Sequence, residues 1–130
     1  MGIQKVQNQI FKCNVCGNLI EILHGATGIL FCCGEAMDLL DSNTIDASVD
    51  KHKPILISNG ENSIVKIGTV PHPMEPDHFI EWVEIINKSY LNRKFLNAGM
   101  LPEAEFYVHK QIGMKVRAYC NKHGLWESDY

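Results

Sequence analysis

The stretch PILISNGENSIVKIGTV, Pro54 to Val70, contains two runs of aliphatic and β-branched residues on either side of Asn59-Gly60. Asn-Gly favours a tight hairpin turn, because the central positions of such a turn need a backbone conformation that asparagine and glycine tolerate. The stretch therefore predicts a β-hairpin, and Pro54 marks the end of the connector that precedes it.

The same pattern continues from this hairpin toward the C-terminus. Further runs rich in β-branched and aromatic residues lie between turn residues, and they are HFIEWVEII, KFLNAG, AEFYVHKQ and MKVRAYC. Glu81 and Glu84 in FIEWVEII are also spaced as on a helix, but the density of Ile, Val, Phe and Trp favours a strand. Roughly ninety residues of short strands predict a β-sandwich.

The first forty residues have a different character. Glycine-containing turns separate three short strand-like runs, QIFKC, LIEILHG and GILFCCG. A segment this short buries too little apolar surface to fold alone, so it usually needs a metal or disulfides. The following LLDSNTIDASVDKHKP predicts a connector with a helical turn that begins near Ser42 or Asn43. We therefore expect two domains, residues 1–40 and 41–130.

Composition narrows the function classes. The chain has 130 residues, 45% of them hydrophobic, and a formal net charge of -3. It lacks the basic field that nucleic-acid binding needs, so we expect no nucleic-acid partner. The N-terminal residues do not form a charged and then apolar leader, and no apolar run is long enough to span a membrane. We expect a cytoplasmic protein without a membrane partner, in which cysteines serve as metal ligands or reactive thiols.

Four cysteines of the first region have the spacing of a metal site. They form C-x-x-C followed after fifteen residues by C-C, as Cys13, Cys16, Cys32 and Cys33. Four thiolates at such spacing can surround one tetrahedral ion, and Gly17 suits the turn that follows the first pair. A pair of disulfides and a structural zinc ribbon are the alternatives. Adjacent cysteines should distort the tetrahedron, which favours iron over zinc.

A second site is indicated by YCNKHGLW, where Cys120 and His123 are three residues apart. Its other ligands have to come from elsewhere, and three histidines lie in loop-like surroundings of the second region, at His52, His72 and His78. Each of these histidines alone is typical of an ordinary surface residue, but together they predict a cluster. His24 and His109 sit inside strand patterns, and we assign them no ligand role.

These motifs, in the order CNVCGN, CCG, KHKP, PHPMEPDH and YCNKHGLW, resemble those of the desulfoferrodoxins, the two-iron form of superoxide reductase. The resemblance implies a small rubredoxin- or desulforedoxin-like domain followed by an immunoglobulin-like β-sandwich. It implies a tetrahedral iron on the four cysteines, and a second, square-pyramidal iron with an axial Cys120 thiolate and four imidazoles, from His52, His72, His78 and His123. It also implies a homodimer that reduces superoxide to hydrogen peroxide with electrons from a rubredoxin-like donor.

Two residues beside His52 complete this expectation. Lys51 corresponds to the family's lysine next to the open position of the second iron, where its charge would attract the superoxide anion. The family usually has glutamate before that lysine, and this chain has Asp50, whose carboxylate is one methylene shorter. The resemblance therefore does not carry the glutamate's ability to bind ferric iron onto Asp50. A non-catalytic iron protein that only transfers electrons and a zinc-stapled binding module are the alternatives.

Overall fold

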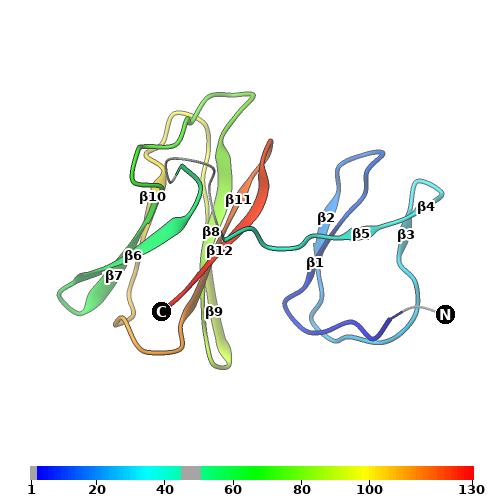
Figure 1. Ribbon diagram of the computed structural model, residues 1–130, viewed down its shortest axis with the longest axis horizontal. Helices are drawn as coiled ribbons and strands as arrows, with labels where there is room; N and C mark the ends of the chain where they lie inside the picture. The colour runs from blue at the N-terminus through cyan, green and yellow to red at the C-terminus, as the bar shows by residue number, and fades with distance from the viewer. Residues whose placement is uncertain (1–2, 45–50) are drawn as a thin grey trace. The chain divides into compact units, whose positions relative to one another are not determined.

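The computed structural model describes residues 3–44 and 51–130 (Figure 1). The chain divides into two compact units, Met1–Asp41 and Ser42–Tyr130. The described residues contain no helix, and their regular structure consists of strands, which confirms the predicted all-β class. No helix capable of crossing a membrane occurs in those same residues.

The smaller unit consists of two small sheets. Its strands are β1 (Ile10–Lys12), β2 (Leu19–Glu21), β3 (Phe31–Cys32), β4 (Glu35–Ala36) and β5 (Asp38–Leu39). The first sheet has the order β2-β1-β5, and β3 pairs with β4 in the second. The sequence predicted the first three strands, although β2 ends at Glu21 and does not continue through LIEILHG. It did not predict β4 and β5, since two-residue strands leave no alternation of apolar and polar residues to detect.

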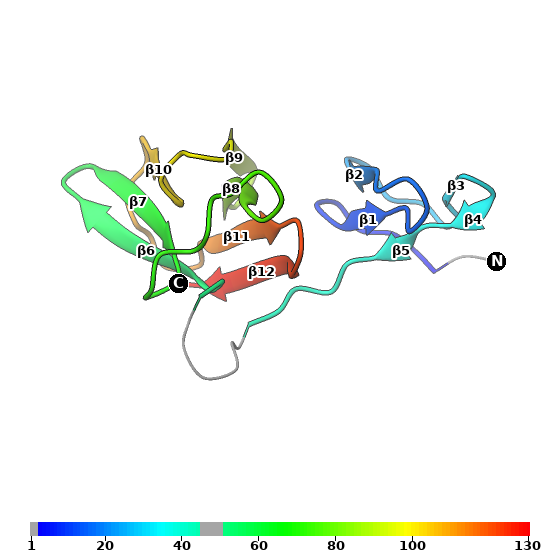
Figure 2. The ribbon, with the colours of Figure 1, turned by 90° about the horizontal axis from the view of Figure 1, so that it is seen from above.

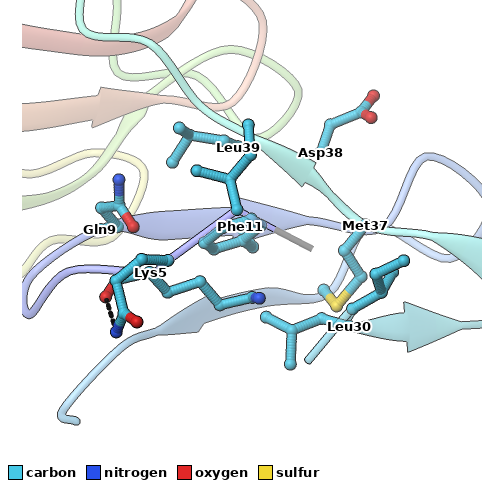
Figure 3. A pocket seen from close by; sticks show the side chains of 10 residues that line it. Lys5, Gln9, Phe11, Leu30, Met37, Asp38 and Leu39 are labelled. Atoms are coloured by element: carbon cyan, nitrogen blue, oxygen red, sulfur yellow. Dashed lines mark hydrogen bonds between the residues drawn. The ribbon is translucent and has the colours of Figure 1, made fainter. Parts of the chain in front are cut away.

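The smaller unit has little apolar core. A hollow of about 280 Å³ opens on one of its faces, and it is lined by Ile3, Gln4, Lys5, Gln9, Phe11, Ile29, Leu30, Met37, Asp38 and Leu39. Figure 3 shows Phe11 of β1 with Leu30, Met37 and Leu39 gathered around it. A unit that leaves this much apolar surface open depends on its cysteines for stability, as its length predicts.

The larger unit is a sandwich of two antiparallel sheets (Figures 1 and 2). Its strands are β6 (Pro54–Asn59), β7 (Asn62–Ile67), β8 (Ile80–Asn87), β9 (Tyr90–Phe95), β10 (Glu103–Phe106), β11 (Lys115–Cys120) and β12 (Gly124–Asp129). One sheet has the order β10-β7-β6 and the other the order β12-β11-β8-β9. The β6–β7 hairpin was predicted, and it closes with Asn59 opposite Asn62, so its turn residues are Gly60 and Glu61, one position later than the predicted Asn59-Gly60.

Alternating side chains from both sheets form the core between them. Leu56 and Val65 come from the three-stranded sheet, and Val83, Ile85 and Val116 come from the four-stranded sheet. All five are buried. The segment FIEWVEII is therefore a strand, as predicted, because residues two apart share one face of a strand.

Some predicted boundaries were wrong. Only the first two residues of the run KFLNAG, Lys94 and Phe95, belong to a strand, which begins earlier, at Tyr90, and β12 was not predicted. Asn43 pairs with Trp126 in a parallel β-bridge, which the sequence did not predict. The predicted helical turn that would follow Asn43 lies mainly outside the described residues.

The residues of β8 that alternate with its core residues include a buried charge. Glu84 is opposite Arg117 of β11 and Arg93 of β9. Its side chain is fully buried, and it accepts hydrogen bonds from Arg117 Nε at 2.6 Å and from Arg93 Nη2 at 2.6 Å. Arg93 also lies over the ring of Trp82, 5.0 Å from the centroid. This ionic cluster joins β8, β9 and β11, three of the four strands in the sheet that carries Cys120.

Candidate metal centres

The four cysteines of the smaller unit converge on one point. Their sulfurs lie within 4.8 Å of one another, with 3.6 Å between Cys16 and Cys32 and 3.9 Å between Cys32 and Cys33. Metal–sulfur bonds of about 2.3 Å at tetrahedral angles place sulfurs ~3.8 Å apart. The sulfur spacings therefore fit a single tetrahedral ion.

Local backbone geometry makes this convergence possible. The turn after Cys13 is closed by Gly17, whose φ is 86°, and its N–H donates to the Cys13 carbonyl at 3.0 Å. Adjacent side chains in an extended chain point in opposite directions. Cys33 instead adopts a left-handed φ of 55°, followed by Gly34 at 78°. This turn lets two adjacent cysteines face the same point. From the sequence, the adjacent cysteines predicted only that the tetrahedron would be distorted.

The acidities of the thiols differ within the group. The backbone N–H of Cys16 is the main cause that holds the pKa of Cys13 at about 6; desolvation opposes it, and the N–H of Val15 adds to it. The neighbouring sulfurs, Cys16 first, raise the pKa of Cys33 to about 12. A bound metal ion would compensate the charge of thiolates gathered at one point. The donor set therefore fits the expected iron.

The second group of ligands is assembled from three separate segments of the larger unit. His52 precedes β6, two histidines lie in the loop between β7 and β8, and the other two ligands lie at the end of β11 and in the turn that follows it. The ligand atoms lie within 4.8 Å of one another, and they come from His52, His72, His78, Cys120 and His123. The structure thus brings together all five predicted ligands of the second site.

The four imidazoles form a closed ring of neighbours. Ring centroids are 4.7 Å apart for His52 and His72, 4.8 Å for His72 and His78, 4.9 Å for His78 and His123, and 4.6 Å for His123 and His52. His123 Nδ1 lies 3.0 Å from His52 Nε2 and 3.2 Å from His78 Nε2. Two metal–nitrogen bonds of about 2.1 Å at a right angle separate their nitrogens by ~3.0 Å. The two measured nitrogen–nitrogen distances fit neighbouring nitrogens at right angles around one metal.

His72 has the clearest signature of a ligand. Its Nδ1 lies 2.6 Å from the Pro73 carbonyl oxygen, so Nδ1 carries the proton that is donated there. Its Nε2 is buried without a hydrogen-bond partner and is therefore the nitrogen that presents a lone pair to the cluster. Burial lowers the pKa of His72 to about 4, which keeps this lone pair available at neutral pH. A buried imidazole nitrogen left in this way is suited to binding a metal.

Cys120 lies at the end of β11 and is fully buried. Its sulfur is 3.6 Å from His123 Nδ1. Burial raises the pKa of the Cys120 thiol, while the backbone N–H groups of Lys122 and His123 act in the opposite direction. A β-bulge between Tyr119 and Cys120 shifts the pairing with β8 at this point. Bulges redirect side chains, and this one accompanies the change from sheet to metal-binding turn.

Two residues without a predicted function support the histidine ring. The Trp126 ring stacks on His52 at 4.7 Å with an interplanar angle of 16°, and its Nε1 donates to the His123 carbonyl at 3.1 Å. Asn43 Nδ2 donates to the His123 carbonyl at 3.4 Å and to the Leu125 carbonyl at 3.2 Å. YCNKHGLW contained this tryptophan, but its spacing gave no sign that the indole would contact two histidines.

The remaining predicted site residues lie outside these two groups of ligands. Lys51 is exposed and directly precedes the buried His52. Asp50 lies outside the described residues. His24 and His109 belong to exposed loops and not to strands, and neither joins the two metal-binding groups found among the described residues.

Comparison with known proteins agrees with this geometry. The desulfoferrodoxin family model matches residues 44–129, and the model of the desulfoferrodoxin N-terminal domain matches residues 5–40. The chain is 47% identical to a desulfoferrodoxin of Syntrophotalea carbinolica over 93% of this chain and 95% of that one. It is 49% identical to a desulfoferrodoxin homolog of Methanothermobacter thermautotrophicus over 92% of this chain and 96% of that one.

A solved structure extends the comparison to the fold. The superoxide reductase from Treponema pallidum superposes with a TM-score of 0.75 at 26% identity, covering 93% of this chain and 97% of that one. The group of four cysteines and the group of four histidines with one cysteine confirm the predicted cofactors, since they match the two iron centres of a desulfoferrodoxin. Matches of both domain models, together with sequence identity over nearly the full length of both chains, show that this chain belongs to the desulfoferrodoxin family.

Proposed function

We propose that this chain is a superoxide reductase, an oxidoreductase that adds one electron and two protons to superoxide and releases hydrogen peroxide. The observation that carries the proposal is the closed ring of four imidazoles beside the buried sulfur of Cys120. Relatives that carry the name superoxide reductase include the protein from Treponema pallidum and one from Pyrococcus horikoshii, 28% identical to this chain.

The donor set suits this chemistry. Iron bound by His52, His72, His78, His123 and Cys120 would supply the electron by passing from the ferrous to the ferric state. The neutral imidazoles add no charge, and the Cys120 thiolate stabilises the more positive oxidised state. The N–H groups of Lys122 and His123 that face this sulfur moderate how much electron density it donates.

Lys51 is the residue we propose for attracting the substrate. Its ammonium group is exposed and adjacent in sequence to the ligand His52. A cation at this place would increase the local concentration of superoxide, and it would orient a water molecule that supplies a proton to the departing peroxide. Lys51 therefore belongs to the proposed catalytic residues.

Lys51→Gln should slow the second-order reaction with superoxide by roughly 10-fold at low ionic strength, the lower end of the range for electrostatic steering. The difference from wild type should shrink as salt is added, because the Debye length is about 10 Å at 0.1 M. Lys88→Gln is the matched control, since Lys88 is exposed at the far end of β8. Pulse radiolysis over a series of salt concentrations measures both rates. Parallel salt dependences of wild type and Lys51→Gln would exclude steering by Lys51.

Asp50 is proposed to stay off the iron. Loss of one methylene shortens the side chain by about 1.5 Å, whereas metal–ligand distances vary by only about 0.2 Å. The oxidised site would then be five-coordinate or hold water, and it would accept azide or cyanide in that position.

Several finer features are part of the same proposal. We infer that residues 1–40 form the desulforedoxin-like iron domain and residues 41–130 the catalytic domain, and that the electrons come from a rubredoxin-like donor. A cytoplasmic location suits metal-bound thiolates, which need a reducing compartment. The resemblance to the family also supports a homodimer, which sedimentation would detect as twice the chain mass of 14.7 kDa.

One experiment tests the proposed function. The protein is analysed for iron and zinc, reduced, and mixed with a pulse of superoxide while absorption is followed. We expect two irons per chain and a rapid band of ferric thiolate, with hydrogen peroxide formed in proportion. Iron without reaction would leave only electron transfer, and zinc at both sites would leave only a binding module.

A further inference from the structure

The turn that carries Cys120 and His123 also contains Asn121, whose side chain faces the loop before β8. Its Nδ2 donates to the Asp77 carbonyl at 3.0 Å, and its Oδ1 accepts from the Phe79 N–H at 3.0 Å. The Asn121 N–H also donates to the Phe79 carbonyl at 3.3 Å. One residue thus makes three hydrogen bonds to the backbone on both sides of His78. We propose that Asn121 is a positioning residue that holds His78 in the histidine site.

His78 needs a connection of this kind more than His52 and His72 do. His52 is buried and stacked against Trp126, and the Nδ1 of His72 is bound to the Pro73 carbonyl. His78 is only half-buried and lies in a loop. Backbone hydrogen bonds of 2.9 and 3.0 Å between Glu75 and His78 close the tip of that loop on itself. They fix its local shape and leave its place relative to the Cys120 turn to other contacts.

Exposed Lys122 and Asp77 form one such contact, an ion pair of 3.8 Å, and Asn121 supplies the hydrogen-bonded one. The two segments that it joins are 42 to 44 residues apart in sequence, and each contributes ligands to the same group. The contact lies directly beside the 3.2 Å approach of His78 Nε2 to His123 Nδ1. Metal–ligand bonds require placement within about 0.2 Å. A side chain that fixes the separation of the two segments therefore determines whether His78 reaches the metal.

The alternative is that Asn121 only stabilises the loop that contains His78 and does not position this histidine. The two possibilities differ in what changes: loop stabilisation affects unfolding of the metal-free protein, whereas positioning affects metal retention at one site only. The cysteine site in the same chain serves as an internal reference, because it shares no ligand with the histidine site.

This inference rests on the proposed iron site but not on its reaction. Wild type and Asn121→Leu, a substitution that keeps the branching at Cγ and removes the side-chain hydrogen bonds, are loaded with iron and exposed to a chelator. Mössbauer spectroscopy follows the sulfur-coordinated and nitrogen-coordinated irons separately. We expect the histidine site of Asn121→Leu to lose iron about 10- to 100-fold faster, the usual effect of removing a supporting contact. Release from the cysteine site should be unchanged.

The matched control is Asn59→Leu, which removes an exposed amide hydrogen bond to Glu105 in the same unit. The proposal is overturned if Asn121→Leu retains iron as wild type does. It is also overturned if that variant loses iron equally from both sites. A third contrary result is that metal-free Asn121→Leu melts at a temperature well below that of metal-free Asn59→Leu. If Asn121→Leu does not fold, Asn121→Asp replaces it in the experiment. Aspartate retains the acceptor for the Phe79 N–H and loses the donor to the Asp77 carbonyl. If Asn121→Asp retains iron as wild type does, the proposal is equally overturned. Faster iron loss in proteins that do not react with superoxide would reject the proposed function alone.

Discussion

Changing Cys13 to serine removes the iron of the cysteine site, and the histidine site continues to react with superoxide at the wild-type rate when an external reductant supplies the electrons. The Cys13 sulfur is almost completely buried, and it accepts hydrogen bonds from the backbone N–H groups of Val15 and Cys16, each at 3.4 Å. A serine hydroxyl cannot replace this thiolate as a soft ligand. All ligands of the second group belong to the larger unit, so their arrangement does not depend on Cys13.

The measurement combines iron analysis with pulse radiolysis of the reduced variant. Loss of one iron per chain with an unchanged second-order rate is the expected result. The matched comparison is Cys120→Ser, which should lose the fast reaction and keep the cysteine-site spectrum. If the Cys13→Ser protein folds and retains its second iron but reacts slowly, the two sites do not divide the work as we infer.

Changing Glu84 to leucine should lower the free energy of unfolding of the larger unit by about 3–5 kcal/mol, the usual cost of removing one partner from a buried ion pair. Glu84 is fully buried, and Arg117 beside it is 6% exposed. The substitution leaves this guanidinium without the carboxylate that compensates its charge. For a domain of this size the melting temperature should fall by at least ~12 °C.

The control for this prediction is Lys115→Met. It removes a half-exposed ion pair with Glu127 on the same sheet, so it should cost less than about 1 kcal/mol. A combined variant in which Glu84, Arg93 and Arg117 are all replaced by apolar residues should recover much of the loss, because no charge is then left buried. Chemical denaturation gives the three free energies. If Glu84→Leu and Lys115→Met lower the free energy of unfolding equally, burial of the Glu84 cluster does not increase its contribution to stability.

Local patterns in the sequence carried much of this structure. The Asn59-Gly60 hairpin was predicted because its turn chemistry is local, and FIEWVEII was predicted as a strand because its composition outweighed a helical spacing of two glutamates. The nine ligand residues were identified because cysteine and histidine are chemically distinctive and lie in short motifs that resemble a known family. Each of these signals is contained within a few neighbouring residues.

The missed features depend on contacts between distant segments. Asn121 binds backbone groups more than forty residues away, and an asparagine in a turn gives no sign of such partners. The bridge between Asn43 and Trp126 was not predicted, because cap residues and strand-bridging asparagines look alike in sequence. The burial of Glu84 was not predicted either, since only the pairing of β8 with β9 and β11 places two arginines beside it.

The spacing of the ligands along the chain also sets the order in which the two centres can form during synthesis. Cys13 and Cys32 are 19 residues apart, whereas His52 and His123 are separated by 71. The cysteine centre is therefore complete in a short nascent chain and can take up iron while the ribosome is still translating the sandwich. The histidine centre has to wait until β11 has paired with β8, because its last two ligands lie at the end of that strand and in the turn after it.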